Sequence, residues 1–159
     1  MKVFKFGGAS VKDAAGVKNL SSIVHQQHGQ LIVVVSAMGK TTNLLETLCN
    51  AYFHQDPKTT AIMKELKNFH LDIVNTLFPL NDTIHKHLEE LFTSLENILA
   101  SESSLCYDYE YDRIICFGEL ISTTIISDYL KMKGIENQFI DIRKYLKTDQ
   151  NYRNANIDL

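Results

Sequence analysis

The sequence begins with MKVFKFGGASVKDAAGVKNLSSIVHQQHGQLIVVV over residues 1–35, in which two strand-like runs flank a helix-like segment. Lys2–Phe6 alternates and is rich in residues that favour strands, and Gly7-Gly8 ends it. Leu31–Val35 is a continuous apolar run of mostly β-branched residues, which is typical of a strand covered on both faces. We therefore expect two strands of one sheet, joined through residues 9–30.

The segment between these runs has the pattern of one amphipathic helix. Val17, Leu20 and Val24 recur at the spacing of three to four residues that places them on one helix face. Ser10 can cap the start of this helix, and Gly29 can stop it. Strand, glycine turn, helix and strand make a βαβ unit, which predicts an α/β fold with a mainly parallel sheet.

Further amphipathic helices follow, and we expect a helical insertion over about residues 41–112. The expected boundaries are a cap at Thr41 or Thr42, a start at Asp56-Pro57, a break at Pro79, a cap at Asn81 or Asp82 and a fourth helix from near Asp108. A fifth helix is predicted from Glu119 to Lys133, and a strand over Glu136–Asp141. Residues 143–159 are polar without a strong element, so we expect the natural chain to continue beyond Leu159.

Composition limits the possible classes of protein. The chain has 159 residues, a formal net charge of −3 and 45% hydrophobic residues, as in ordinary globular proteins. The acidic balance argues against a nucleic-acid partner, whose phosphates would require a basic face. No apolar run approaches the roughly 20 residues that a membrane span needs, and no secretory leader is evident, so we expect a cytoplasmic protein that uses no membrane. His25 and His28, or His85 and His87, lack further ligands at suitable spacing, so no metal site is predicted.

Two loops that directly follow the predicted strands carry small and hydroxyl residues, namely residues 7–10 and 36–43. Ligands bind at the carboxyl ends of strands in open α/β sheets, and a Gly-Gly pair lets backbone amides approach a phosphate. Lys5, just inside the first strand end, can supply a compact cation. Gly39-Lys40-Thr41 imitates the end of a P-loop, but Val34 stands where that motif needs glycine, so the P-loop interpretation is rejected.

Four motifs resemble the aspartokinase family, within the wider amino-acid kinase superfamily. They are Lys5-Phe-Gly-Gly-Ala-Ser-Val11, Val34-Val-Ser-Ala-Met-Gly-Lys-Thr-Thr-Asn43, Phe117-Gly-Glu-Leu-Ile-Ser122 and Asp141-Ile-Arg143, in the family's order. The resemblance implies part of a three-layer αβα sandwich with a mainly parallel sheet and a helical insertion. It also implies transfer of the γ-phosphoryl group of ATP, with Mg²⁺ and no prosthetic group, to the side-chain carboxylate of L-aspartate. A homo-oligomer is a further expectation.

The resemblance also implies residue roles. Lys5 resembles the catalytic lysine that bridges the ATP phosphates, and Gly7, Gly8, Ala9 and Ser10 resemble the loop whose amides face them. Ser36 and Thr42 resemble residues that hold aspartate, and Glu119 resembles the carboxylate that contacts its α-ammonium group. Ala9 departs from the usual Thr or Ser, which removes one hydroxyl but leaves the amide.

The later half of the family pattern, with its nucleotide-base site and regulatory ACT domains, has no counterpart within 159 residues, and the chain alone is expected to be inactive. Two alternatives remain open. One is a non-catalytic amino-acid-binding domain or truncated paralogue. The other is a different kinase of the superfamily.

Overall fold

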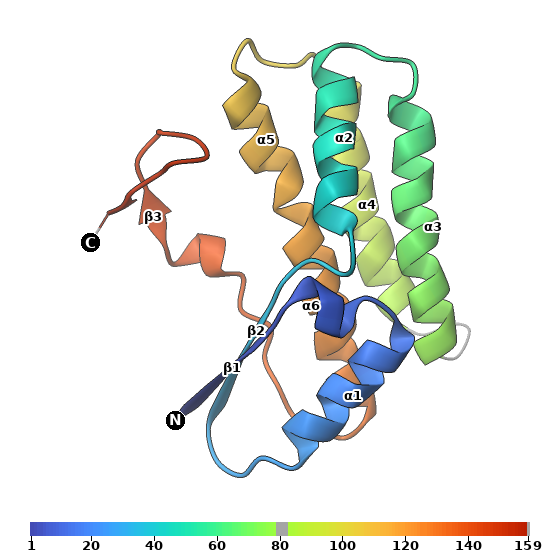
Figure 1. The fold of residues 1–159 in the computed structure, drawn as a ribbon, viewed down its shortest axis with the longest axis vertical. Helices are drawn as coiled ribbons and strands as arrows, with labels where there is room; N and C mark the ends of the chain where they lie inside the picture. The colour runs from blue at the N-terminus through green and yellow to red at the C-terminus, as the bar shows by residue number, and fades with distance from the viewer. Residues whose placement is uncertain (79–82, 159) are drawn as a thin grey trace.

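A computed structural model describes residues 1–78 and 83–158 (Figure 1). In chain order the elements are β1 (Lys2–Phe6), the 3-10 helix η1 (Gly8–Val11), α1 (Ala14–His25), β2 (Leu31–Val35), α2 (Thr41–Phe53), α3 (Thr59–Leu77), α4 (Thr83–Ala100), α5 (Tyr107–Ile115), α6 (Phe117–Met132), the 3-10 helix η2 (Ile142–Lys144), β3 (Lys147–Thr148) and β4 (Ile157–Asp158). The predicted α/β organisation, with β1 and β2 pairing in parallel, is confirmed. No helix of the described part is long and apolar enough to cross a membrane.

The two faces of the β1–β2 sheet differ. Phe6 and Val33 pack with Val35 into the core on the face that meets α6. On the opposite face Ile32 and Val34 are 46% and 45% exposed. The prediction that Leu31–Val35 is covered on both faces is therefore wrong for the described chain, because its helices lie against one face only.

Helix α1 starts later than the sequence suggested. Its cap is Asp13, whose Oδ1 accepts a hydrogen bond from the Gly16 amide at 2.8 Å. Ser10 does not cap α1, because it lies inside η1 and its amide donates to the Gly7 carbonyl at 2.9 Å. Gly29 has a φ of +84° in the turn before β2, three residues beyond the Gln26 cap that ends α1.

Helices α2 to α5, which we call the helical block, stand beside one another above the sheet, and α6 runs from the block down to it (Figure 1). Their predicted positions are confirmed. The fully buried side chains that join block and α6 include Leu45, Leu48, Leu66, Ile84, Leu88, Phe92, Leu95, Ile114, Ile121 and Ile125.

The capping predictions in the block have mixed outcomes. Thr41 begins α2, but neither Thr41 nor Thr42 makes a side-chain cap. Asp56 accepts a hydrogen bond from the Lys58 amide at 2.8 Å just before α3. The predicted break at Pro79 and the cap at Asn81 or Asp82 lie outside the described residues.

The segment after α6 contains no long strand among the described residues. Gly134 has a φ of +76° and ends α6 as predicted. The predicted strand Glu136–Asp141 is wrong, because no strand of the described chain pairs with it. Its last residue, Asp141, instead caps η2. Instead, the Asn137 amide group donates to the Ser127 carbonyl at 3.1 Å, which holds this segment against α6. A short β3–β4 hairpin follows, which the sequence did not predict.

Candidate functional site

Three of the four motifs meet at one buried residue, Ala37, in the loop between β2 and α2. Ala37 is 4% exposed, and its amide donates to Glu119 Oε1 at 3.2 Å. A Cβ added at Gly8 would lie 2.6 Å from the Ala37 carbonyl oxygen, and one added at Gly118 would lie 2.8 Å from the Ala37 Cβ. Both glycines are therefore required for this close packing. We call residues 7–10, 36–43 and 117–122 together the loop cluster.

Backbone hydrogen bonds fix the loop cluster further. The Ser36 amide donates to the Phe6 carbonyl at 3.0 Å, and the Gly39 amide donates to the Gly8 carbonyl at 3.0 Å. The hydroxyl of Ser122 in α6 donates to the Ser36 carbonyl at 2.9 Å. Gly39 itself has a φ of +55°, a conformation that favours glycine. The cluster is thus shaped mainly by main-chain atoms and by small residues that let them approach.

Lys5 is exposed at the carboxyl end of β1, in register with Val34 of β2. No hydrogen bond or ion pair reaches its ammonium group from residues 1–78 or 83–158. The free ammonium group remains available to a ligand at the strand end.

The first loop has room for a ligand beside it. A Cβ on Gly7 would meet nothing within 4 Å, and Ala9 and Ser10 are exposed. Because η1 begins at Gly8, the first amides of this turn have no partner inside the 3-10 helix. Such amides at a helix start can face an anion.

The residues expected to hold an amino acid lie on the other two loops. Ser36 and Thr42 are partly buried, and their hydroxyl groups make no hydrogen bond within the described residues. Glu119 is exposed in the first turn of α6; one of its oxygens accepts from Ala37, and no described group reaches Oε2. The second oxygen can therefore accept from a ligand ammonium group.

The fourth motif lies next to the start of α6. Arg143 donates to both oxygens of Asp141, at 2.9 Å and 2.8 Å, and to Cys116 Sγ at 3.3 Å. The hydrogen bond from Arg143 lowers the pKa of Asp141, and burial raises the pKa of the Cys116 thiol. The hydrogen bond to Cys116 ties the segment after α6 to the residue immediately before Phe117, three residues before Glu119.

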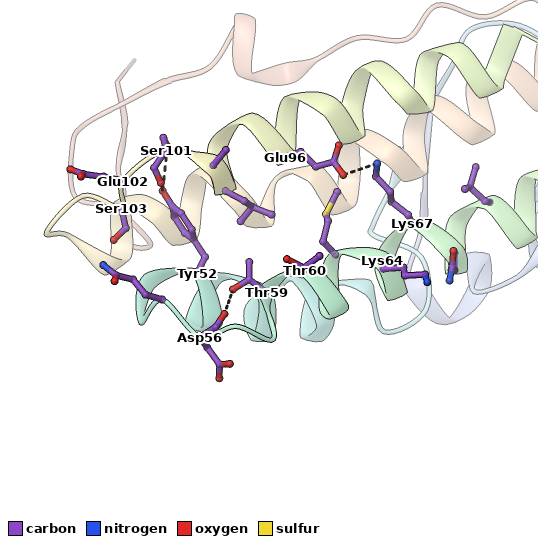
Figure 2. A pocket seen from close by; sticks show the side chains of 16 residues that line it. Tyr52, Asp56, Thr59, Thr60, Lys64, Lys67, Glu96, Ser101, Glu102 and Ser103 are labelled. Carbon is purple, nitrogen blue, oxygen red and sulfur yellow. Dashed lines mark hydrogen bonds and ion pairs between the residues drawn. The ribbon is translucent and has the colours of Figure 1, made fainter.

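A separate cavity of about 860 Å³ lies in the helical block, between the end of α2, α3 and the end of α4 (Figure 2). Lys67 and Glu96 form an ion pair of 2.7 Å across it, and the Tyr52 hydroxyl donates to the Ser101 carbonyl at 3.1 Å. None of the predicted site residues lines this cavity. No group of three or more His, Cys, Asp or Glu side chains in residues 1–78 and 83–158 is arranged to hold a metal ion.

Sequence reasoning missed Ala37 as the centre of the cluster and gave no role to His70, which lies beneath the second loop. The sequence did contain a signal for Ala37: the second motif has this small residue, and the first and third motifs have the glycines Gly8 and Gly118 that pack against it. His70 carries no comparable signal, because it lies in an ordinary helical stripe and its contact with Thr41 joins residues 29 positions apart.

Comparison with known proteins gives one consistent result. Residues 1–159 match the amino acid kinase family. The chain is 27% identical to the lysine-sensitive aspartokinase 3 of Escherichia coli (strain K12), over 99% of this chain and 34% of that protein. It is 30% identical to the chloroplastic aspartokinase 2 of Arabidopsis thaliana, over 98% of this chain and 29% of that protein. The crystal structure of E. coli aspartokinase III in complex with aspartate and ADP matches with a TM-score of 0.87 at 26% identity, over 99% of this chain and 35% of that one. The chain therefore spans about a third of the length of these relatives.

Proposed function

The chain belongs to the amino acid kinase family, and from that premise we propose that the protein is an aspartokinase. It transfers the γ-phosphoryl group of ATP to the side-chain carboxylate of L-aspartate and forms 4-phospho-L-aspartate and ADP. One observation carries this proposal. Three loops converge at Ala37 beside the strand ends. There, Lys5 of β1 has an ammonium group and Glu119 has a carboxylate oxygen that no described residue pairs.

The loop cluster supplies what phosphoryl transfer requires, which is positioning and charge neutralisation rather than covalent help. An oxygen of the aspartate side chain attacks the γ-phosphorus, and the bond to the β,γ-bridging oxygen breaks. Lys5 neutralises charge that builds on the phosphate oxygens. The amides of Gly7, Gly8 and Ala9 line the phosphate side, and Ser10, whose amide is held by the Gly7 carbonyl, adds its exposed side chain.

The second and third loops hold the amino acid. Glu119 Oε2 accepts hydrogen bonds from the α-ammonium group, since a fixed carboxylate is the natural partner of an ammonium group. The hydroxyl groups of Ser36 and Thr42 bind the carboxylates. Because Glu119 Oε1 is already held by the Ala37 amide, the second oxygen is aimed before the substrate arrives.

Further parts of the proposal extend beyond the described chain. Mg²⁺ enters with ATP as part of the substrate complex, and no residue of this chain is assigned to it. The protein works in the cytoplasm as a homo-oligomer, and its product serves the synthesis of lysine, threonine and methionine. Of these statements the names of the relatives bear only on lysine, since one relative is a lysine-sensitive aspartokinase; the others follow from the resemblance to the aspartokinase family.

The test is an assay of the protein at its full natural length with MgATP and hydroxylamine, which traps acyl phosphates as hydroxamates. L-Aspartate should give hydroxamate and ADP in equal amounts, whereas glutamate, acetylglutamate, carbamate and uridylate should not. ADP formation with one of the other substrates alone would assign the protein to another kinase of the family. Aspartate binding in a calorimeter without ADP production would indicate a binding domain instead.

A further inference from the structure

His70 is a fully buried histidine of α3 that lies outside the sequence motifs. Its Nδ1 lies 2.8 Å from the Leu66 carbonyl oxygen, and its Nε2 lies 3.3 Å from the hydroxyl of Thr41. The ring also packs 6.4 Å from the ring of Phe92 in α4, centroid to centroid. One imidazole therefore joins α3 and α4 of the helical block to the first residue of α2.

The contacts of His70 fix its tautomer. A carbonyl oxygen can only accept, so the proton lies on Nδ1, and Nε2 must accept from the Thr41 hydroxyl. Burial lowers the pKa of His70 to about 4, so the ring is neutral near pH 7. Thr41 is only 2% exposed, and without Nε2 its hydroxyl would lose the one side-chain partner that the described residues give it.

Thr41 in turn contacts several parts of the loop cluster. Its amide donates to the Met38 carbonyl at 3.0 Å and closes the turn that contains Gly39. The Thr41 Cγ2 lies 3.6 Å from where a Cβ added at Gly118 would stand. The ring of Phe69, the neighbour of His70 in the chain, lies 3.4 Å from where a Cβ added at Gly39 would stand. Phe69 and His70 therefore both pack against the second loop, residues 36–43.

We propose that His70 is a positioning residue: it holds Thr41, and through Thr41 the helical block fixes the loop 36–43 that carries Ser36 and Thr42. The inference rests on the proposed function for its effect on aspartate, but the restraint on the loop itself does not. Loss of one buried hydrogen bond of this kind corresponds to about a 3- to 10-fold change in an equilibrium. The effect should fall on aspartate, because Ser36 and Thr42 belong to its part of the site.

The experiment compares three variants of the protein at full natural length. Thr41→Val removes the hydroxyl but keeps the shape, and Thr41→Ser keeps the hydroxyl. Tyr52→Phe is the matched control, because it removes the bond to Ser101 at the other end of the same helix, α2. Amide hydrogen exchange of residues 36–43 and the KM values for aspartate and ATP are measured for each.

Thr41→Val should speed exchange of the loop amides and raise the KM for aspartate about 3- to 10-fold, with the KM for ATP within twofold. Thr41→Ser should restore both quantities, and Tyr52→Phe should leave both unchanged. Unchanged exchange in Thr41→Val, or an equal rise of both KM values, overturns the inference. If the unsubstituted protein shows no aspartate-dependent turnover, the proposed function fails, while the exchange rates still decide whether this contact restrains the loop.

Discussion

The loop cluster and the helical block use their residues in opposite ways. In the loop cluster the contacts are made by backbone atoms and by residues without long side chains, such as Gly8, Ala37 and Gly118. Two long polar side chains, Glu119 in the cluster and Lys5 beside it in β1, are exposed and keep atoms that no described residue pairs. In the helical block, large apolar side chains are fully buried against one another. The difference implies that stability and activity depend on separate sets of residues.

Shortening a buried side chain of the helical block should therefore lower the stability of the protein but leave its catalytic rate nearly unchanged. Leu88→Ala in α4 removes a fully buried side chain and should lower the free energy of unfolding by about 2–5 kcal/mol. At temperatures where the variant is folded, kcat and both KM values should stay within twofold. Chemical denaturation and steady-state kinetics provide the measurements, with Glu89→Ala, exposed on the same helix, as the control. A loss of kcat in the folded variant would contradict the separation.

Lys5→Ala tests the reverse case. Removing a cation that acts on the transferring phosphoryl group should lower kcat by about 100-fold or more, as loss of a contact made in the transition state does. The melting temperature should change by less than about 2 °C, because Lys5 is exposed and has no partner in the described chain. Kinetics and differential scanning calorimetry on the same sample are the measurements. Ordinary kcat in this variant would remove Lys5 from the site.

His70 lies where the two regions meet, and its titration should make stability depend on pH. The pKa of His70 is about 4 in the folded protein, below the ordinary value of 6.5. The contribution of the neutral ring to the free energy of unfolding is therefore fully present above pH 6.5 and is lost as the pH falls towards 4. Between pH 7 and pH 5 this corresponds to about 2 kcal/mol. Unfolding free energies at both pH values should show that difference, and His70→Gln should remove it. The same pH dependence in both proteins would assign it to other groups.

Glu119→Gln examines the exposed carboxylate of the cluster. The amide oxygen of glutamine can still accept from the Ala37 amide, so the loop should keep its place. The charge that faces the substrate ammonium group is lost, and the KM for aspartate should rise about 10-fold with little change for ATP. Steady-state kinetics with each substrate varied in turn is the measurement. Equal increases for both substrates would indicate a general defect of the fold.

Most helices and the first two strands could be predicted from the sequence, but the contacts between them could not. Periodicity located β1, β2 and the helices of the block, because each depends on its own residues and on a buried face. The strand predicted at Glu136–Asp141 failed, because a strand requires a neighbouring strand, and none pairs with this segment in the described chain. The roles of Ala37 and His70 depend on contacts between residues far apart in sequence, and no local pattern encodes those contacts.

The loop cluster also borders α1, since three residues separate the end of the first loop from the start of this helix. Sequence favoured Ser10 as its cap, whereas the structure gives this role to Asp13. Asp13→Ala should therefore lower the free energy of unfolding by about 1 kcal/mol, because the Gly16 amide loses its acceptor, and should leave the kinetics unchanged. Ser10→Ala should leave stability unchanged, and any effect of that change should appear in the KM for ATP, since Ser10 belongs to the first loop. Denaturation curves of the two variants, measured side by side with ATP kinetics, make the comparison. A stability loss in Ser10→Ala equal to that in Asp13→Ala would show that the first loop helps to hold α1, and the separation of stability from activity would then fail at Ser10.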